Sequence, residues 1–246
     1  MTDQPAPVSY RPRIWEVDFL RGVAIILMVG YHLLYDLGAM VGVRSFLGFS
    51  TDLSTRAWTI AQLFFAGLFV VLSGISSTLS RGNVRRGLKL AAVALLVTAA
   101  TYVFDRTSTI LFGILHCLAV SILIYGLLLE KAGAAACAAA GILVIGLGKG
   151  LGAVLKGAPI GTNWLLPFGF HDAALNSFDY FPLFPWLGIF LIGAALGKSV
   201  YASKRSLIAN PWPVTFVNLA GRHSLLIYIV HQPIILGALT IFGLIR

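Results

Sequence analysis

The chain has 246 residues, of which 58% are hydrophobic and only 11% are charged. A soluble domain of this length carries roughly twice that share of charge, so this composition and the mean hydropathy of +0.89 exclude a soluble protein. The net charge of +9 does not indicate a nucleic-acid-binding protein, because the basic residues flank apolar segments and form no soluble basic face. We therefore expect a polytopic protein of the lipid bilayer.

The polar residues 1–17 contain prolines and are predicted to form a tail before the first apolar run. No small-residue cleavage site follows that run, so we expect a retained helix and not a signal peptide. The sequence predicts an all-α bundle forming one transmembrane domain over residues 18–246. A spanning helix needs about 20 apolar residues, and about seven segments qualify: 19–41, 57–79, 87–104, 109–129, 133–150, 182–200 and 223–243.

The first predicted helix carries a stripe of ionisable residues. Arg21 and His32 are eleven positions apart, which is about 20° of rotation on an α-helix, and Asp36 follows four residues later. Ionisable groups inside a bilayer are costly and usually face a bundle interior or a wet cavity. A carboxylate one turn away can orient an imidazole and raise its basicity. We therefore interpret His32 with Asp36 as a general base within the membrane.

Three further polar residues lie in or beside the later segments, and each also has a plain structural interpretation. His116 is a candidate second base, although a lone intramembrane histidine often bonds a neighbouring helix. Asp179 precedes the sixth segment and could simply cap it. His231 precedes Gln232 and Pro233, and it could satisfy a backbone carbonyl that the proline leaves free.

The charges of the connections predict the orientation. The N-terminal tail and the connections 80–89 and 198–222 are basic, and with seven spans they fall on one side. By the positive-inside rule this side is cytoplasmic, so the N-terminus is cytoplasmic and the long connection 151–181 is an outer segment. The histidines and carboxylates are then expected in the outer half and middle of the membrane, above a basic rim that suits phosphate: Arg21, Arg85, Arg86 and Arg222.

Three stretches of the chain resemble bacterial and archaeal relatives of heparan-α-glucosaminide N-acetyltransferase. They lie in order over nearly the whole chain and read RIWEVDFLRGVAIILMVGYHLLYDL, then FGILHCLAV with DYFPLFPWLGIFLIGAALG, and finally GRHSLLIYIVHQP. The spacing of Arg21 and His32 also resembles the signature of the broader superfamily of transmembrane acyltransferases.

This resemblance implies an enzyme of a prokaryotic cytoplasmic membrane that moves acetyl from cytoplasmic acetyl-CoA to an amino or hydroxyl group of a sugar outside. It also favours a homodimer, and we expect no metal. His32 is then the essential histidine and Arg21 its paired arginine, and the remaining signature polar residues are His116, Asp179 and His231. We assign Asp36, His116 and Asp179 with His32 to the catalytic group, and His231 with the arginines to binding of acetyl-CoA. A proton-coupled transporter or a non-catalytic membrane component are the alternatives, although no repeated halves typical of transporters are visible.

Overall fold

The computed structural model describes residues 13–154, 163–209 and 215–245 of the chain. Within these ranges the first half contains α1 (Trp15–Asp36) continuing into the π-helical η1 (Leu37–Val41), a hairpin of β1 (Ser45–Phe46) and β2 (Phe49–Ser50), α2 (Arg56–Leu79) and α3 (Asn83–Phe104). The second half contains α4 (Ile114–Ile124) continuing into η2 (Tyr125–Leu129), α5 (Ala134–Val154), η3 (Leu166–Phe168), α6 (Leu183–Ser199), α7 (Phe216–Arg222) and α8 (Ser224–Ile241).

The all-α membrane bundle predicted from the sequence is confirmed. Each of the seven predicted segments coincides with a helix, and five helices in the described residues are long and apolar enough to cross a membrane. The other two, Ile114–Leu129 and Leu183–Ser199, are apolar but shorter. The structure adds α7, a short helix immediately before α8, which the sequence analysis placed in a connection.

Small residues allow the helices to approach closely. A side chain at Gly188 of α6 would meet the carbonyl oxygen of Gly141 at 2.6 Å, so α5 and α6 pack backbone against backbone. At Gly22 of α1 and Gly221 of α7 there is likewise no room for a side chain. A Cβ at Gly221 would collide with the carbonyl oxygen of Asp18. This contact brings the end of α7 beside the first turns of α1, which is the region of the basic residues.

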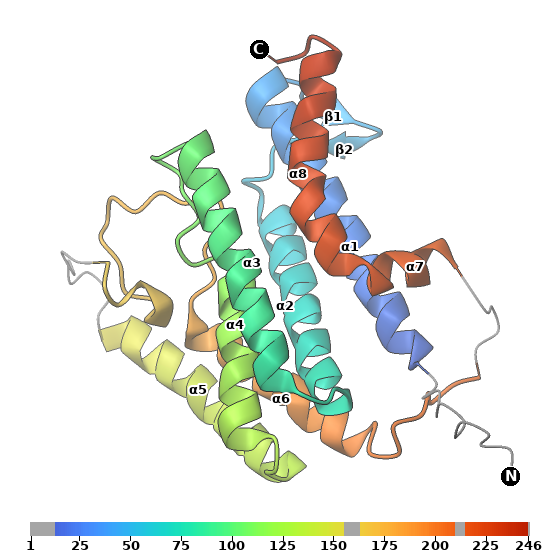
Figure 1. The fold of residues 1–246 in the computed structure, drawn as a ribbon. Coiled ribbons are helices and arrows are strands. Elements are labelled where there is room, and N and C mark those ends of the chain that lie inside the picture. The colour runs from blue at the N-terminus through green and yellow to red at the C-terminus, as the bar shows by residue number, and fades with distance from the viewer. Residues whose placement is uncertain (1–12, 155–162, 210–214, 246) are drawn as a thin grey trace, which may run out of the picture.

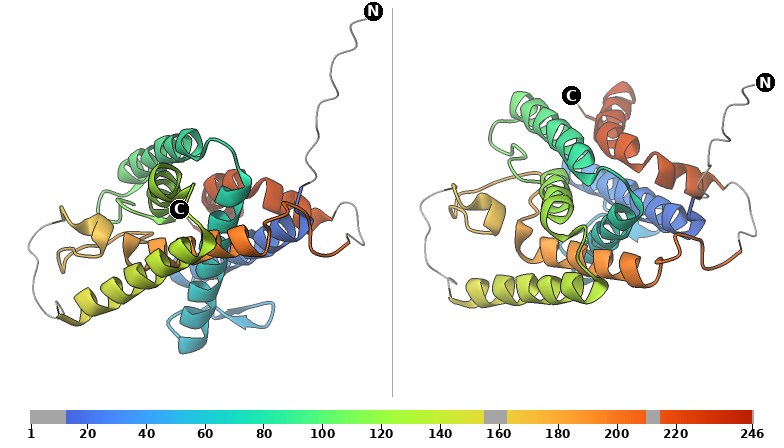
Figure 2. Two further views of the ribbon diagram at one scale, coloured as in Figure 1. Left: turned by 90° about the horizontal axis from the view of Figure 1, so that it is seen from below. Right: turned by 60° about the horizontal axis from the view of Figure 1, so that its bottom comes forward.

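The directions of the helices determine which helix ends lie together. Helices α1, α3 and α8 run upward in Figure 1, whereas α2 runs downward, and α8 lies beside α1. The start of α3, the end of α6 and the start of α1 therefore meet at one end of the bundle, and Figure 2 shows the same arrangement from below.

The three basic regions of the sequence meet at this end. Arg13, Arg86 and Lys204 each come from a different region, and all three line the same cavity. The assignment of this end to the cytoplasm stays a prediction. The predicted tail falls mostly on residues 1–12, and part of the predicted outer connection on residues 155–162, which are outside the described ranges.

Candidate active site

A cavity of about 850 Å³ lies inside the basic end of the bundle. This volume is in the range of small-molecule sites, about 300–1,000 Å³. Five basic residues line it: Arg13, Arg21, Arg86, Lys89 and Lys204. Further along α2, α3 and α4 the lining becomes apolar: Phe69, Leu90, Val93, Leu115, Leu118 and Ile122. We call this cavity the basic cavity. Its lining is cationic at the end of the bundle and apolar further inside.

The reach of the basic cavity follows from its lining residues. Phe69 lies ten residues before the end of α2 at Leu79, which is about 15 Å along a helix. Tyr228 of α8 also lines the cavity and lies one turn before His231. The cavity therefore extends from the arginines at the end of the bundle to within one helical turn of His231.

Asp18 gathers three arginines at the cationic end. Its carboxylate lies 3.3 Å from Arg21 Nη1, 3.5 Å from Arg222 Nε and 3.8 Å from Arg13 Nη1. The other guanidinium nitrogen of Arg21 donates to the hydroxyl of Ser76 on α2. Two of the predicted phosphate-binding arginines, Arg21 and Arg222, are thus held together by an acid that the sequence analysis did not select. The i, i+3 spacing of Asp18 and Arg21 is the signal that could have found it.

The other two predicted arginines are adjacent in sequence but lie differently. Arg86 is partly buried and lines the basic cavity, whereas Arg85 is exposed and is not among the lining residues. Neighbouring side chains on an α-helix diverge by about 100°, so only one of the two can face the cavity.

His32 of α1 and His231 of α8 face each other across the seam between these helices, with ring centroids 4.9 Å apart. The Nδ1 of His231 lies 2.6 Å from the carbonyl oxygen of Tyr228. A carbonyl only accepts, so we assign the proton to Nδ1, and the neutral ring keeps a lone pair at Nε2. This Nε2 is buried and has no hydrogen-bond partner among the described residues. The histidine pair therefore offers an unused proton-accepting nitrogen.

Asp36 lies in the same seam but is held by a different partner from the one expected. It is 1% exposed, and its carboxylate accepts a hydrogen bond of 2.8 Å from the amide of Gln232. No hydrogen bond joins Asp36 to His32 within the described part of the chain. Its second carboxylate oxygen is buried without a partner there, as is the amide oxygen of Gln232. Gln232 directly follows His231. Asp36 therefore holds the side chain of the residue next to the histidine pair.

The carboxylate of Asp179 bonds the first turn of α4 and not that of α6. Its carboxylate accepts hydrogen bonds from the backbone N–H of Ile114 at 2.8 Å and from the hydroxyl of Tyr228 at 3.1 Å. Burial raises the pKa of this carboxyl, and the two hydrogen bonds oppose the rise. The acid thus caps a helix, as the plain interpretation supposed, but the helix is a different one.

Both ring nitrogens of His116 are occupied. Its Nδ1 accepts from the backbone N–H of Gly113 at 3.3 Å, and its Nε2 lies 3.1 Å from the hydroxyl of Thr98. The Thr98 hydroxyl donates to the carbonyl of Ile110 at 2.7 Å, so it accepts from Nε2–H. This arrangement is a helix cap that ties α3 to the start of α4.

The predicted meeting of polar residues therefore occurs as two clusters. We call His32, Asp36, His231 and Gln232 the seam cluster, and Asp179, His116 and Thr98 the cap cluster. Tyr228 connects them, since its hydroxyl bonds Asp179 and its ring lies 5.7 Å from that of His231. Tyr228 was not among the residues expected from the sequence, although it lies one turn before His231 on the same face.

Comparison with known proteins gives one finding. The family model described as "Heparan-alpha-glucosaminide N-acetyltransferase, catalytic" matches residues 13–233. This range covers nearly the whole chain and includes both clusters and the basic cavity. Neither the curated proteins nor the solved structures give a match.

Proposed function

The chain belongs to the heparan-alpha-glucosaminide N-acetyltransferase catalytic family, a family of membrane acetyltransferases, and on this premise we propose its donor, acceptor and base. The donor is acetyl-CoA, bound from the cytoplasmic side. The acceptor is an amino or hydroxyl group of a sugar on the other side of the bilayer. His32 is the general base, and His231 supports it.

The observation that carries this proposal is the basic cavity. CoA has an anionic end with phosphates and a long, uncharged arm that ends in the thioester. Arginine and lysine side chains are the usual partners of phosphate, and the cationic end offers Arg21, Arg86 and Lys89. The arm would lie along the apolar lining toward Tyr228. The thioester would then approach the seam cluster.

The chemistry needs one proton acceptor near the thioester. The nitrogen or oxygen of the acceptor forms a bond to the acetyl carbon while the carbon–sulfur bond breaks. The proton of the acceptor passes to the imidazole of His32 and then to the CoA thiolate, which leaves as the thiol. The free Nε2 of His231, 4.9 Å away between ring centroids, can share this proton and so stabilise the charged pair.

The proposal is tested with the purified full chain in lipid nanodiscs, supplied with acetyl-labelled acetyl-CoA and glucosamine or a hydroxyl-bearing sugar. We expect labelled sugar and an equal amount of free CoA thiol. Substitution His32→Ala is expected to remove the product, whereas the control His223→Ala, an exposed histidine before α8, retains it. The proposal is wrong if the wild-type chain neither binds acetyl-CoA nor releases CoA with either type of acceptor.

A further inference from the structure

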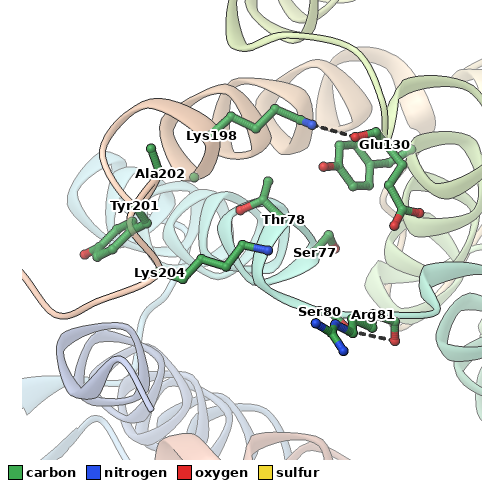
Figure 3. A pocket seen from close by; sticks show the side chains of 11 residues that line it. Ser77, Thr78, Ser80, Arg81, Glu130, Lys198, Tyr201, Ala202 and Lys204 are labelled. Carbon is green, nitrogen blue, oxygen red and sulfur yellow. Dashed lines mark hydrogen bonds between the residues drawn. The ribbon is translucent and has the colours of Figure 1, made fainter. Parts of the chain in front are cut away.

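A second cavity of about 380 Å³ lies beside the basic cavity, and Figure 3 shows it from close by. It is formed by the end of α2 and the connection that follows it, by residues at the two ends of η2, and by the end of α6 with the segment after it. The polar and charged side chains of its lining include Ser77, Thr78, Arg81, Glu130, Lys198 and Lys204. Only Ser80 and Lys204 also line the basic cavity, so the two are neighbours with separate linings. We call this one the polar pocket.

The charges of the polar pocket leave two cations available. Lys198 is engaged, because its ammonium donates to the backbone carbonyl of Glu130 at 2.7 Å and lies 5.4 Å from the ring centre of Tyr125. Arg81 and Lys204 form no ion pair within the described residues. Figure 3 shows the Lys204 ammonium pointing into the pocket toward Ser77 and Thr78. An anionic group would find two cationic partners here.

The same pocket also offers hydrogen-bond acceptors, and Figure 3 shows one of them, Glu130, across from Lys204. The hydroxyls of Ser77 and Thr78 already donate to backbone carbonyls, at 2.9 and 2.8 Å, so their oxygens are free to accept. Glu130 contributes the acidic side chain of the lining. A ligand that fits this pattern has a phosphate at one end and an amine or hydroxyl donor at the other. That is the chemistry of a phospholipid headgroup.

The place of the polar pocket agrees with this chemistry. It lies at the ends of candidate spans, since α2 ends at Leu79 and α3 begins at Asn83, and lipid headgroups occupy this level of a bilayer. Basic pockets between transmembrane helices at this level bind lipid phosphates. The neighbouring residues Leu127 and Leu128 of η2 are exposed, at 67% and 75%, and present an apolar surface on which acyl chains can lie.

We propose that the polar pocket binds the phosphate of a membrane phospholipid headgroup, at a site distinct from that of the acyl donor. The phosphate lies between Arg81 and Lys204, and the amine or hydroxyl of the headgroup donates to Glu130. Because Lys204 lines both cavities, a lipid bound here also fixes one of the cations of the basic cavity.

The test measures lipid binding to the full chain by native mass spectrometry after delipidation. Phosphatidylglycerol and phosphatidylethanolamine are added separately, and inorganic phosphate is added as a soluble competitor. We expect Arg81→Gln to weaken lipid binding about tenfold or more, because it removes one of the two cations at the phosphate. The matched control is Arg205→Gln, an exposed arginine at the same end that lines neither cavity, and its lipid binding is expected to be unchanged.

The outcomes separate the sources of the phosphate and the two sites. Loss of lipid in Arg81→Gln alone supports a headgroup site, and competition by inorganic phosphate identifies the phosphate as the recognised group. If the chain binds inorganic phosphate but neither phospholipid, the lipid assignment is wrong. Equal lipid binding by both variants overturns the pocket. A tenfold loss of acetyl-CoA binding in Arg81→Gln would show a single donor site and overturn the separation, whatever the result of the acetyl-transfer assay.

Discussion

The seam cluster and the cap cluster both contain a histidine and an aspartate, yet they differ in how completely their hydrogen bonds are formed. In the cap cluster, both nitrogens of His116 and the carboxylate of Asp179 have partners. In the seam cluster, buried atoms of His231, Asp36 and Gln232 have none among the described residues. Buried polar groups are normally satisfied, and the exceptions often serve chemistry. The contrast teaches that a histidine in a membrane helix is a candidate for proton transfer when one of its ring nitrogens has no hydrogen-bond partner.

The largest expected effect is on His32. Replacement by alanine removes the proposed base, so the turnover number should fall about 10²–10⁴-fold. The thermal unfolding midpoint in detergent should change little, since His32 is only partly buried and makes ring contacts but no hydrogen bond in the described part of the chain. Turnover per folded molecule, measured by release of CoA thiol, checks this. A small loss of turnover would remove the functional distinction between the clusters.

His231 should follow. His231→Gln keeps a polar side chain but loses the imidazole that shares the proton, and we expect turnover to fall about ten- to hundredfold, at the low end of acid–base contributions. The pH dependence of turnover should change as well, because one member of the pair no longer titrates. Initial rates across a pH series measure both effects. An unchanged profile with reduced turnover would leave His231 a packing role only.

Asp179 should affect stability more than turnover. Asp179→Ala leaves the N–H of Ile114 and the hydroxyl of Tyr228 without their acceptor, which costs about 1–3 kcal/mol for each buried group. We expect a lower thermal midpoint, with turnover per folded molecule reduced less than in His32→Ala. Asp179→Asn keeps an acceptor oxygen and serves as the matched control. If the asparagine variant is stable but inactive, the cap cluster takes part in the chemistry.

The smallest effect is expected for His116. His116→Gln retains a donor and an acceptor for Gly113 and Thr98, so stability should fall by no more than about 1 kcal/mol. Turnover should remain within a few-fold of the wild type, since neither ring nitrogen is free to accept a proton. Parallel unfolding and acetyl-transfer assays check this. A loss as large as that of His32→Ala would make His116 the base instead.

Much of the fold could be predicted from the sequence because each membrane helix corresponds to a local apolar run. The stripe of Arg21 and His32 is equally local, since helix geometry alone places both residues on one face. Helix geometry also implies that only one of Arg85 and Arg86 can face the basic cavity. Which of the two it is depends on the position of the neighbouring helices, and the structure shows that it is Arg86.

The partners across helices were not predictable in this way. Asp36 is bound by Gln232, which lies 196 residues further along the chain, and Asp179 bonds Ile114 across 65 residues. Such pairs depend on which helices pack together, and the neighbour of a helix cannot be predicted from the sequence of that helix alone. Asp36 was therefore assigned to the nearest histidine on its own helix, although its hydrogen bond comes from α8.

A structure of the full chain with CoA bound tests the central claim most directly. The account predicts phosphates beside Arg21 and Arg86, the arm along the apolar lining of the basic cavity, and the sulfur close to Tyr228 and the pair of His32 and His231. A sulfur beside His116, or a CoA molecule outside the basic cavity, would contradict it.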